Sequence, residues 1–149
     1  MAFLCFIGGD WILRLCNETI TVFNAKLDEE NDMDVYCSTV ISGVFWFSEI
    51  AASVEGAGGL KAANKFTIRI PVDADFSGKA YADPIAYAGG DPNYLFTLKN
   101  GDIIVRGAVD EQGLRPADLK KKYPEIVTIL GVTDNTRAPR SKHWKVVGT

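Results

Sequence analysis

The fold of this chain is decided by Gly101-Asp102-Ile103-Ile104-Val105-Arg106-Gly107, an apolar, β-branched run with a glycine at each end. Such a run is typical of a buried strand. The residues before it predict a hairpin, in which 94–98 pairs with 102–106, because Asn100-Gly101 tolerates the positive φ angles of a tight turn. The run contains no nucleophile, metal-binding cluster or phosphate-binding loop, so its predicted role is structural.

Alternating polar and apolar residues predict further strands on both sides of this run, at 19–24, 34–50, 65–71, 126–135 and 143–148. The strand at 34–50 is expected to bend or bulge at Gly43, where its two faces change character. One short helix is expected at 115–123, and Asp83-Pro84 could begin another. Closing or strongly bending the sheet would bury these faces without leaving long edges. We therefore expect a mainly β protein: a small β-barrel or strongly bent antiparallel sheet, with one short helix and long loops.

Length and composition fit one folded domain. The chain has 149 residues, of which 47% are hydrophobic and 23% charged, and we expect residues 16–149 to form a single β domain. The net charge of −3 argues against a protein whose main task is to grip nucleic acid phosphates. The three cysteines, Cys5, Cys16 and Cys37, fit neither a zinc motif nor a disulfide framework, so reduced intracellular thiols are expected.

The first 15 residues are set apart from this domain. They are too short and too interrupted for a signal peptide or a membrane span, and no membrane partner is expected. Ile7-Gly8-Gly9-Asp10 can be encoded by a purine-rich ribosome-binding sequence, with translation then starting near Leu13. The segment is thus either an extension from a mis-assigned start codon or an arm that packs on a neighbouring subunit. An intact mass that lacks only the first methionine would exclude the extension.

The residue types that usually carry chemistry are sparse. His143 is the only histidine, and its best partners for a convergent catalytic site are Asp134 and Ser141. A structural histidine beside a capping aspartate explains the same residues more simply. The acidic run at 26–34 lacks the glycine and terminal glutamate of an EF-hand and predicts a solvated hairpin loop. The glycine-rich segment at 53–64 matches no phosphate-binding pattern and predicts a mobile loop. We expect no catalytic residue, no metal and no cofactor.

Val44-Phe45-Trp46-Phe47 is apolar on both faces of its predicted strand. One face is therefore expected to meet another layer or another subunit. These four residues are the candidate subunit contact, and an aromatic platform for a ligand is the alternative.

Several segments together resemble a family of small head or neck proteins from tailed phages and prophages of Gram-positive bacteria, over about residues 19–148. They are Ser42-Gly43-Val44-Phe45-Trp46, Asp73-Ala74-Asp75-Phe76-Ser77-Gly78-Lys79, the opening run, the 115–123 helix, Thr128-Ile129-Leu130-Gly131-Val132-Thr133-Asp134-Asn135, Ala138-Pro139 and His143-Trp144-Lys145-Val146-Val147-Gly148. The C-terminal half also resembles phage head–tail joining (stopper) proteins, which are small β-barrels. The long excursion at 72–94 departs from the short stopper pattern and leaves the position within the neck open.

The resemblance implies a mechanical function in the virion neck, assembled in the cytoplasm of the host bacterium. Copies would form a ring, commonly a hexamer, below the portal and adaptor. The ring would retain packaged DNA without reading its sequence and would receive the tail proteins. The loops expected to line the channel or contact partners are 53–64, 72–94 and 136–142, with candidate residues Lys61, Lys79, Tyr81, Tyr87, Arg137, Arg140 and Lys142. A tail terminator or minor capsid protein is the alternative, and an enzyme or small-ligand binder is a remote one.

Overall fold

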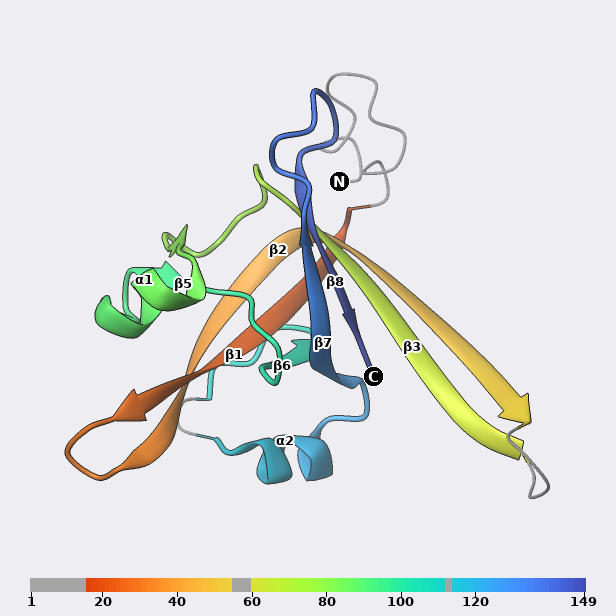
Figure 1. Cartoon of the computed structure of the whole chain (residues 1–149), viewed down its shortest axis with the longest axis horizontal. Helices are drawn as coiled ribbons and strands as arrows, with labels where there is room; N and C mark the ends of the chain where they lie inside the picture. Colours follow the sequence, from red (N-terminus) through yellow and green to blue (C-terminus); the bar gives the residue numbers. More distant parts are fainter. Residues whose placement is uncertain (1–15, 55–59, 112–113) are drawn as a thin grey trace.

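Six strands close into an antiparallel barrel in the order β1-β2-β3-β8-β7-β6, and β6 pairs back onto β1. The computed structural model describes residues 16–54, 60–111 and 114–149 (Figure 1). The predicted N-terminal segment, residues 1–15, lies outside them. The elements are β1 (Glu18–Asp28), β2 (Met33–Val54), β3 (Leu60–Pro71), β4 (Ala80–Tyr81), α1 (Pro84–Gly89), β5 (Leu95–Phe96), β6 (Ile103–Arg106), α2 (Pro116–Lys122), β7 (Ile126–Asp134) and β8 (His143–Gly148).

The barrel interior is filled by apolar side chains from all six barrel strands. Its fully buried members include Ile20, Ile41, Ile68 and Ile104. The excursion between β3 and β6 adds an aromatic layer, in which Phe76 packs on both Phe96 and Trp144. The prediction of a small, mainly β barrel is confirmed.

A second core lies on the outer face of β1 and β6, where α2 covers them. Phe23, Ile103 and Val105 pack there with Leu119 of α2. The alternation of polar and apolar residues at 19–24 predicts a strand with one buried face, but 20–24 is buried on both faces. The reason is that the barrel core contacts one face and the helix-covered core contacts the other. The expectation of one helix was also too low, because Asp83 Oδ1 accepts the amides of Ile85 and Ala86 at 3.0 and 2.9 Å and so caps α1.

The predicted hairpin between 94–98 and 102–106 is wrong. β5 pairs in parallel with β4, and β6 pairs with β1 and β7. The turn itself is present, with Gly101 at a φ of 89° and the amide of Asp102 donating to the carbonyl of Lys99 at 3.3 Å. The turn therefore redirects the chain into the barrel without pairing the segments on either side of it.

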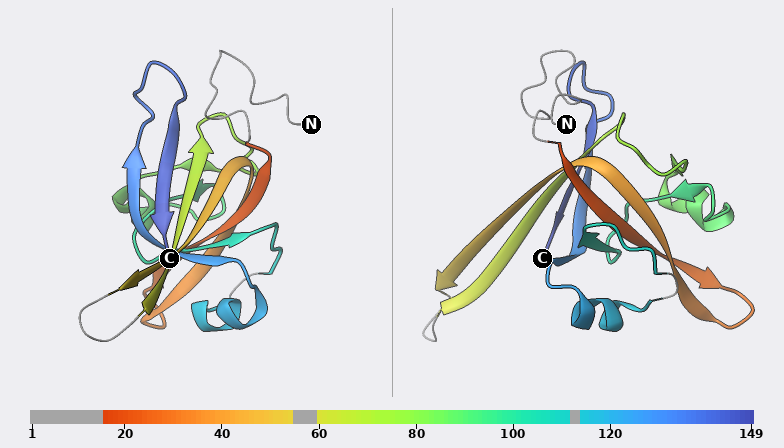
Figure 2. Two further views of the ribbon diagram at one scale, coloured as in Figure 1. Left: turned by 90° about the vertical axis from the view of Figure 1, so that its right-hand side faces the viewer. Right: turned by 180° about the vertical axis from the view of Figure 1, so that it is seen from behind.

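Two hairpins continue beyond the barrel and project on opposite sides of it (Figure 1). β1 and β2 stay paired as far as Asp28 and Met33, whereas β1 contacts β6 only over 20–23. β2 and β3 stay paired as far as Val54 and Leu60, whereas β8 pairs with β3 only from Phe66 onward. The β7–β8 loop projects from one end of the barrel, and α2 lies at the other end (Figure 2). The 22-residue strand β2 thus links both projecting hairpins.

Candidate interaction surface

A bulge at Gly43 sets which β2 side chains face outward. Val44 pairs with Glu18 and Ser42 with Thr19, so Gly43 is an extra residue on β2, with a φ of 88°. Glycine adopts this left-handed conformation without strain. The alternation of faces resets at the bulge, and the predicted bend at Gly43 is confirmed.

The outward side chains after the bulge form an aromatic and basic surface. The rings of Phe45 and Phe47 stack with centroids 6.5 Å apart, and Phe47 is 50% exposed. Arg69 lies opposite Phe45 on β3, with its guanidinium 5.5 Å from the ring centroid, and Lys145 of β8 lies opposite Arg69. With Thr67, these residues line a shallow hollow of about 340 Å³. We call these five residues the aromatic–basic face. A partner that offers apolar side chains together with carboxylates fits its chemistry.

Only half of the predicted subunit contact is available on this surface. Val44 is fully buried in the barrel core. Trp46 is half-buried, packs edge-on against Phe66 at 5.7 Å and lies under the guanidinium of Arg106. Val44 and Trp46 are therefore core residues, and Phe45 and Phe47 remain as contact candidates.

Three candidate residues on the 72–94 loop fasten that segment to the barrel. Lys79 Nζ donates to the Ser38 carbonyl at 2.8 Å and to Thr39 Oγ1 at 3.0 Å, and burial lowers the pKa of this ammonium group. Tyr87 is buried, and the ring of Tyr81 packs at a tilt on Trp144 with centroids 4.6 Å apart. The three side chains therefore make packing and anchoring contacts within the chain, and the role of this loop in a channel or partner contact stays a prediction.

The other two predicted loops differ from each other. The segment at 53–64 is mostly strand, and Lys61 lies on β3 rather than in a loop; residues 55–59 lie outside the described part of the chain. Arg137, Arg140 and Lys142 are exposed on the β7–β8 loop, as expected. This basic loop remains a candidate contact for DNA or a partner protein.

His143 takes the structural role considered from the sequence. Its Nδ1 faces the Ser141 carbonyl, and its Nε2 lies 3.3 Å from the amide nitrogen of Asn135. An Nε2 that accepts from this amide leaves the proton on Nδ1, which donates to the carbonyl. The Asp134 carboxylate caps its own turn by accepting from the hydroxyl of Thr136 and from the amide of Thr136 at 2.8 Å, and these two hydrogen bonds hold the pKa of Asp134 below its usual value.

Sequence reasoning missed a buried polar cluster between β1 and the β5–β6 turn. Asp102 is almost fully buried and accepts from Asn24 Nδ2 at 2.8 Å and from the amide of Ala25 at 3.2 Å. Burial raises its pKa to about 6, and the two hydrogen bonds and nearby Lys99 oppose that rise. The available sequence signal was an aspartate directly before an apolar, β-branched run.

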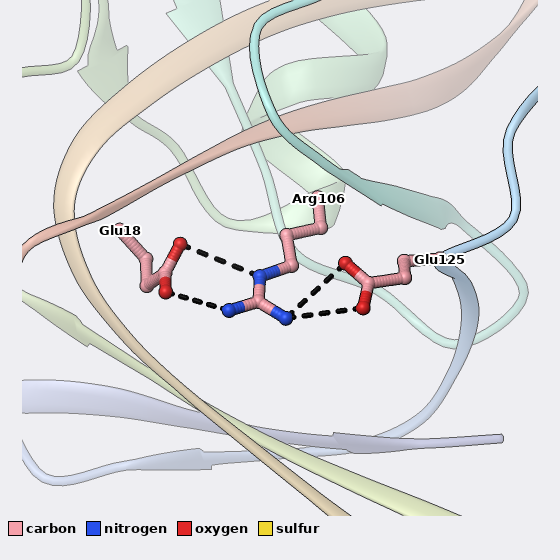
Figure 3. Close-up of polar contacts among 3 residues, drawn as sticks. All are labelled: Glu18, Arg106 and Glu125. Carbon is pink, nitrogen blue, oxygen red and sulfur yellow. Dashed lines mark hydrogen bonds and ion pairs between the residues drawn. The ribbon is translucent and has the colours of Figure 1, made fainter.

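An ion-pair cluster links the end of the short strand β6 to the strands on both sides of it (Figure 3). Arg106 contacts Glu18 at 2.6 Å and Glu125 at 3.1 Å. These carboxylates belong to the start of β1 and to the residue before β7, so one guanidinium joins both neighbours of β6. In the described segments, no group of three or more His, Cys, Asp or Glu side chains could hold a metal ion.

These features define a small six-stranded barrel with projecting hairpins and an exposed aromatic–basic face. The chain belongs to the DUF6751 family, a family of unknown function, whose model matches residues 15–149. Comparison with curated proteins and with solved structures gave no match. No helix in the described ranges has the length and apolar character needed to cross a membrane.

Proposed function

We propose that this protein is a structural component of a tailed-phage virion, a head–tail connector of the stopper or head-completion type. Copies form a ring, commonly hexameric in such proteins, below the portal and adaptor. The ring retains the packaged DNA and offers the attachment surface for the tail. The observation that best supports the proposal is a small barrel from which two long hairpins project, combined with the resemblance of its sequence segments to phage head and neck proteins.

The β2–β3 hairpin favours an assembly role. Beyond the barrel, 49–54 and 60–65 pair only with each other among the described strands. A two-stranded ribbon of this kind is marginally stable alone in water, and its open edges can accept a strand from another chain. Contact with a neighbour would therefore stabilise the ribbon.

The distribution of charge suits a channel through which DNA moves. The whole chain carries −3, which limits tight binding to phosphates. Arg137, Arg140 and Lys142 are exposed together on the β7–β8 loop. In the proposed ring this loop contacts the DNA backbone without reading its sequence.

Electron microscopy of lysates from a phage that lacks this gene tests the proposal, with the gene supplied in trans as control. Filled or leaking heads beside separate tails of normal length are the expected result. Overlong tails would instead identify a tail terminator. Complete particles of normal infectivity would overturn the proposal and favour a ligand-binding role.

A further inference from the structure

The β1–β2 hairpin carries an exposed surface that is both acidic and apolar. Met33 and Val35, which share one face of the hairpin, are 48% and 43% exposed, and Leu27 on the opposite face is 56% exposed, although side chains of this kind usually lie in a core. The acidic residues around them are Asp28, Glu29, Glu30, Asp32 and Asp34. We call residues 27–35 the acidic–apolar hairpin.

Its shape is held by its own turn. Asp28 accepts the amide of Glu30 at 3.1 Å and the side-chain amide of Asn31 at 2.7 Å. Glu29 and Glu30 are exposed and make no ion pair within the described part of the chain. Two carboxylates thus project from a preformed turn and are free to pair with a cation.

The aromatic–basic face complements this hairpin in both respects. Phe45 and Phe47 offer apolar area, and Arg69 and Lys145 offer positive charge beside it. In the described segments, neither cation is neutralised by an acidic residue. Their combination matches apolar side chains flanked by carboxylates.

The two surfaces of one molecule are too far apart to meet. β2 contributes residues to both surfaces, and its backbone from Met33 to Phe45 is roughly 40 Å long at about 3.3 Å per residue. The β1–β2 hairpin projects from one side of the barrel (Figure 1), and β2 separates β1 from β3 and β8, which carry Arg69 and Lys145. A contact between them therefore requires a second molecule.

We propose that the acidic–apolar hairpin of one copy docks on the aromatic–basic face of the next copy. Glu29 and Glu30 pair with Arg69 and Lys145, and the side chains of Met33 and Val35 cover the two phenylalanine rings. Because two different surfaces meet, a docked pair of copies retains one free hairpin and one free face, so further copies can add until the ring closes. This inference rests on the proposed function, in that it assigns the contact between neighbouring subunits of the ring.

Two charge-reversed variants of the full chain test this contact. The face variant carries Arg69→Glu and Lys145→Glu, and the hairpin variant carries Glu29→Lys and Glu30→Lys. Sedimentation velocity over a concentration series at low ionic strength should show self-association of the wild type. Each variant alone should associate about tenfold or more weakly. A 1:1 mixture should regain association, because the acidic hairpin of the face variant meets the basic face of the hairpin variant, and the two reversed surfaces are also opposite in charge.

Lys120→Glu with Lys121→Glu, on the exposed side of α2, is the control for charge reversal away from both surfaces. It should associate as the wild type does. A chain with all four interface reversals should regain self-association, because the charges are exchanged rather than removed. A wild type that stays monomeric, or interface variants that associate as the control does, would overturn the inference. The gene-deletion phenotype is independent of this result, so failure of the contact and failure of the neck function are distinguishable.

Discussion

The side chain of Asn24 pairs with the backbone of Thr97 as a neighbouring strand would. Asn24 Nδ2 donates to the Thr97 carbonyl at 2.7 Å, and Asn24 Oδ1 accepts the Thr97 amide at 3.2 Å. The same Nδ2 also donates to Asp102. Both residues are fully buried, so this one amide fastens the segment before β6 to β1.

Replacing Asn24 should destabilise the fold more than its size suggests. Asn24→Ala leaves the buried amide and carbonyl of Thr97 without partners, and we expect a loss of about 2–4 kcal/mol in the free energy of unfolding. Urea denaturation measures this loss. The control is Asn31→Ala, on the exposed β1–β2 turn, where a small change is expected. Equal effects at the two positions would show that the Asn24–Thr97 pair contributes little.

The pH dependence of stability should carry a component from Asp102. Its pKa is raised from 3.8 to about 6 in the folded protein, so the folded state binds this proton more tightly than the unfolded chain. The contribution of Asp102 to stability is therefore greatest below about pH 4 and falls as pH rises toward the folded pKa, by at most roughly 3 kcal/mol.

Chemical denaturation of the wild type and of Asp102→Asn between about pH 4 and pH 7 tests this sign. The stability of the wild type relative to the variant should decrease through this range. Asp73→Asn removes an exposed carboxylate and serves as the matched control. Parallel profiles for wild type and Asp102→Asn would show that Asp102 titrates alike in the folded and unfolded chains.

Local patterns in the sequence predicted where strands and turns lie better than which strands pair with each other. The bulge at Gly43 could be predicted because the alternation of polar and apolar residues changes phase there. Asn100-Gly101 predicted a turn that does form, but a turn does not dictate which strands pair. Here the Asn24 amide holds Thr97 and β1 occupies the edge of β6. That choice depends on residues more than 70 positions apart, which no local pattern records.

The same limit applies to the candidate surface. The apolar character of Val44-Phe45-Trp46-Phe47 was visible, but its division into two core and two surface residues depends on the bulge and on what covers the inner face. Arg69 and Lys145 join Phe45 only because β3 lies between β2 and β8. The charge beside the aromatic rings is therefore a product of strand order.

The Arg106 cluster should contribute a modest, salt-dependent share of stability. Arg106→Lys keeps the charge but cannot contact Glu18 and Glu125 together in forked geometry, and we expect a loss of about 1 kcal/mol at low salt. Urea unfolding at low and high salt should show this loss shrinking as salt increases. Lys122→Met, which removes the exposed pair with Glu111, should have no measurable effect. A loss that salt leaves unchanged would assign the role of Arg106 to packing on Trp46 instead.

Barrel closure should be most sensitive to volume at Gly148, where β8 contacts both β3 and β7. Gly148 pairs with Phe66 on one side, and an added Cβ would lie 2.3 Å from the Thr128 carbonyl oxygen and 2.4 Å from Val127 Cγ1 on the other. Thr128 cannot easily retreat, because its amide and carbonyl both bond to Thr149.

Gly148→Ala should therefore push β8 away from β7, at a cost of about 2–3 kcal/mol. Gly131→Ala is the matched control on β7, since nothing lies within 4 Å of its added Cβ. Thermal unfolding should show a large drop in Tm for the first variant and little change for the second. Amide hydrogen exchange should also accelerate in β8 of Gly148→Ala, where the ladder to β7 is strained. If both variants melted together with the wild type, the contact at Gly148 would not limit closure of the barrel.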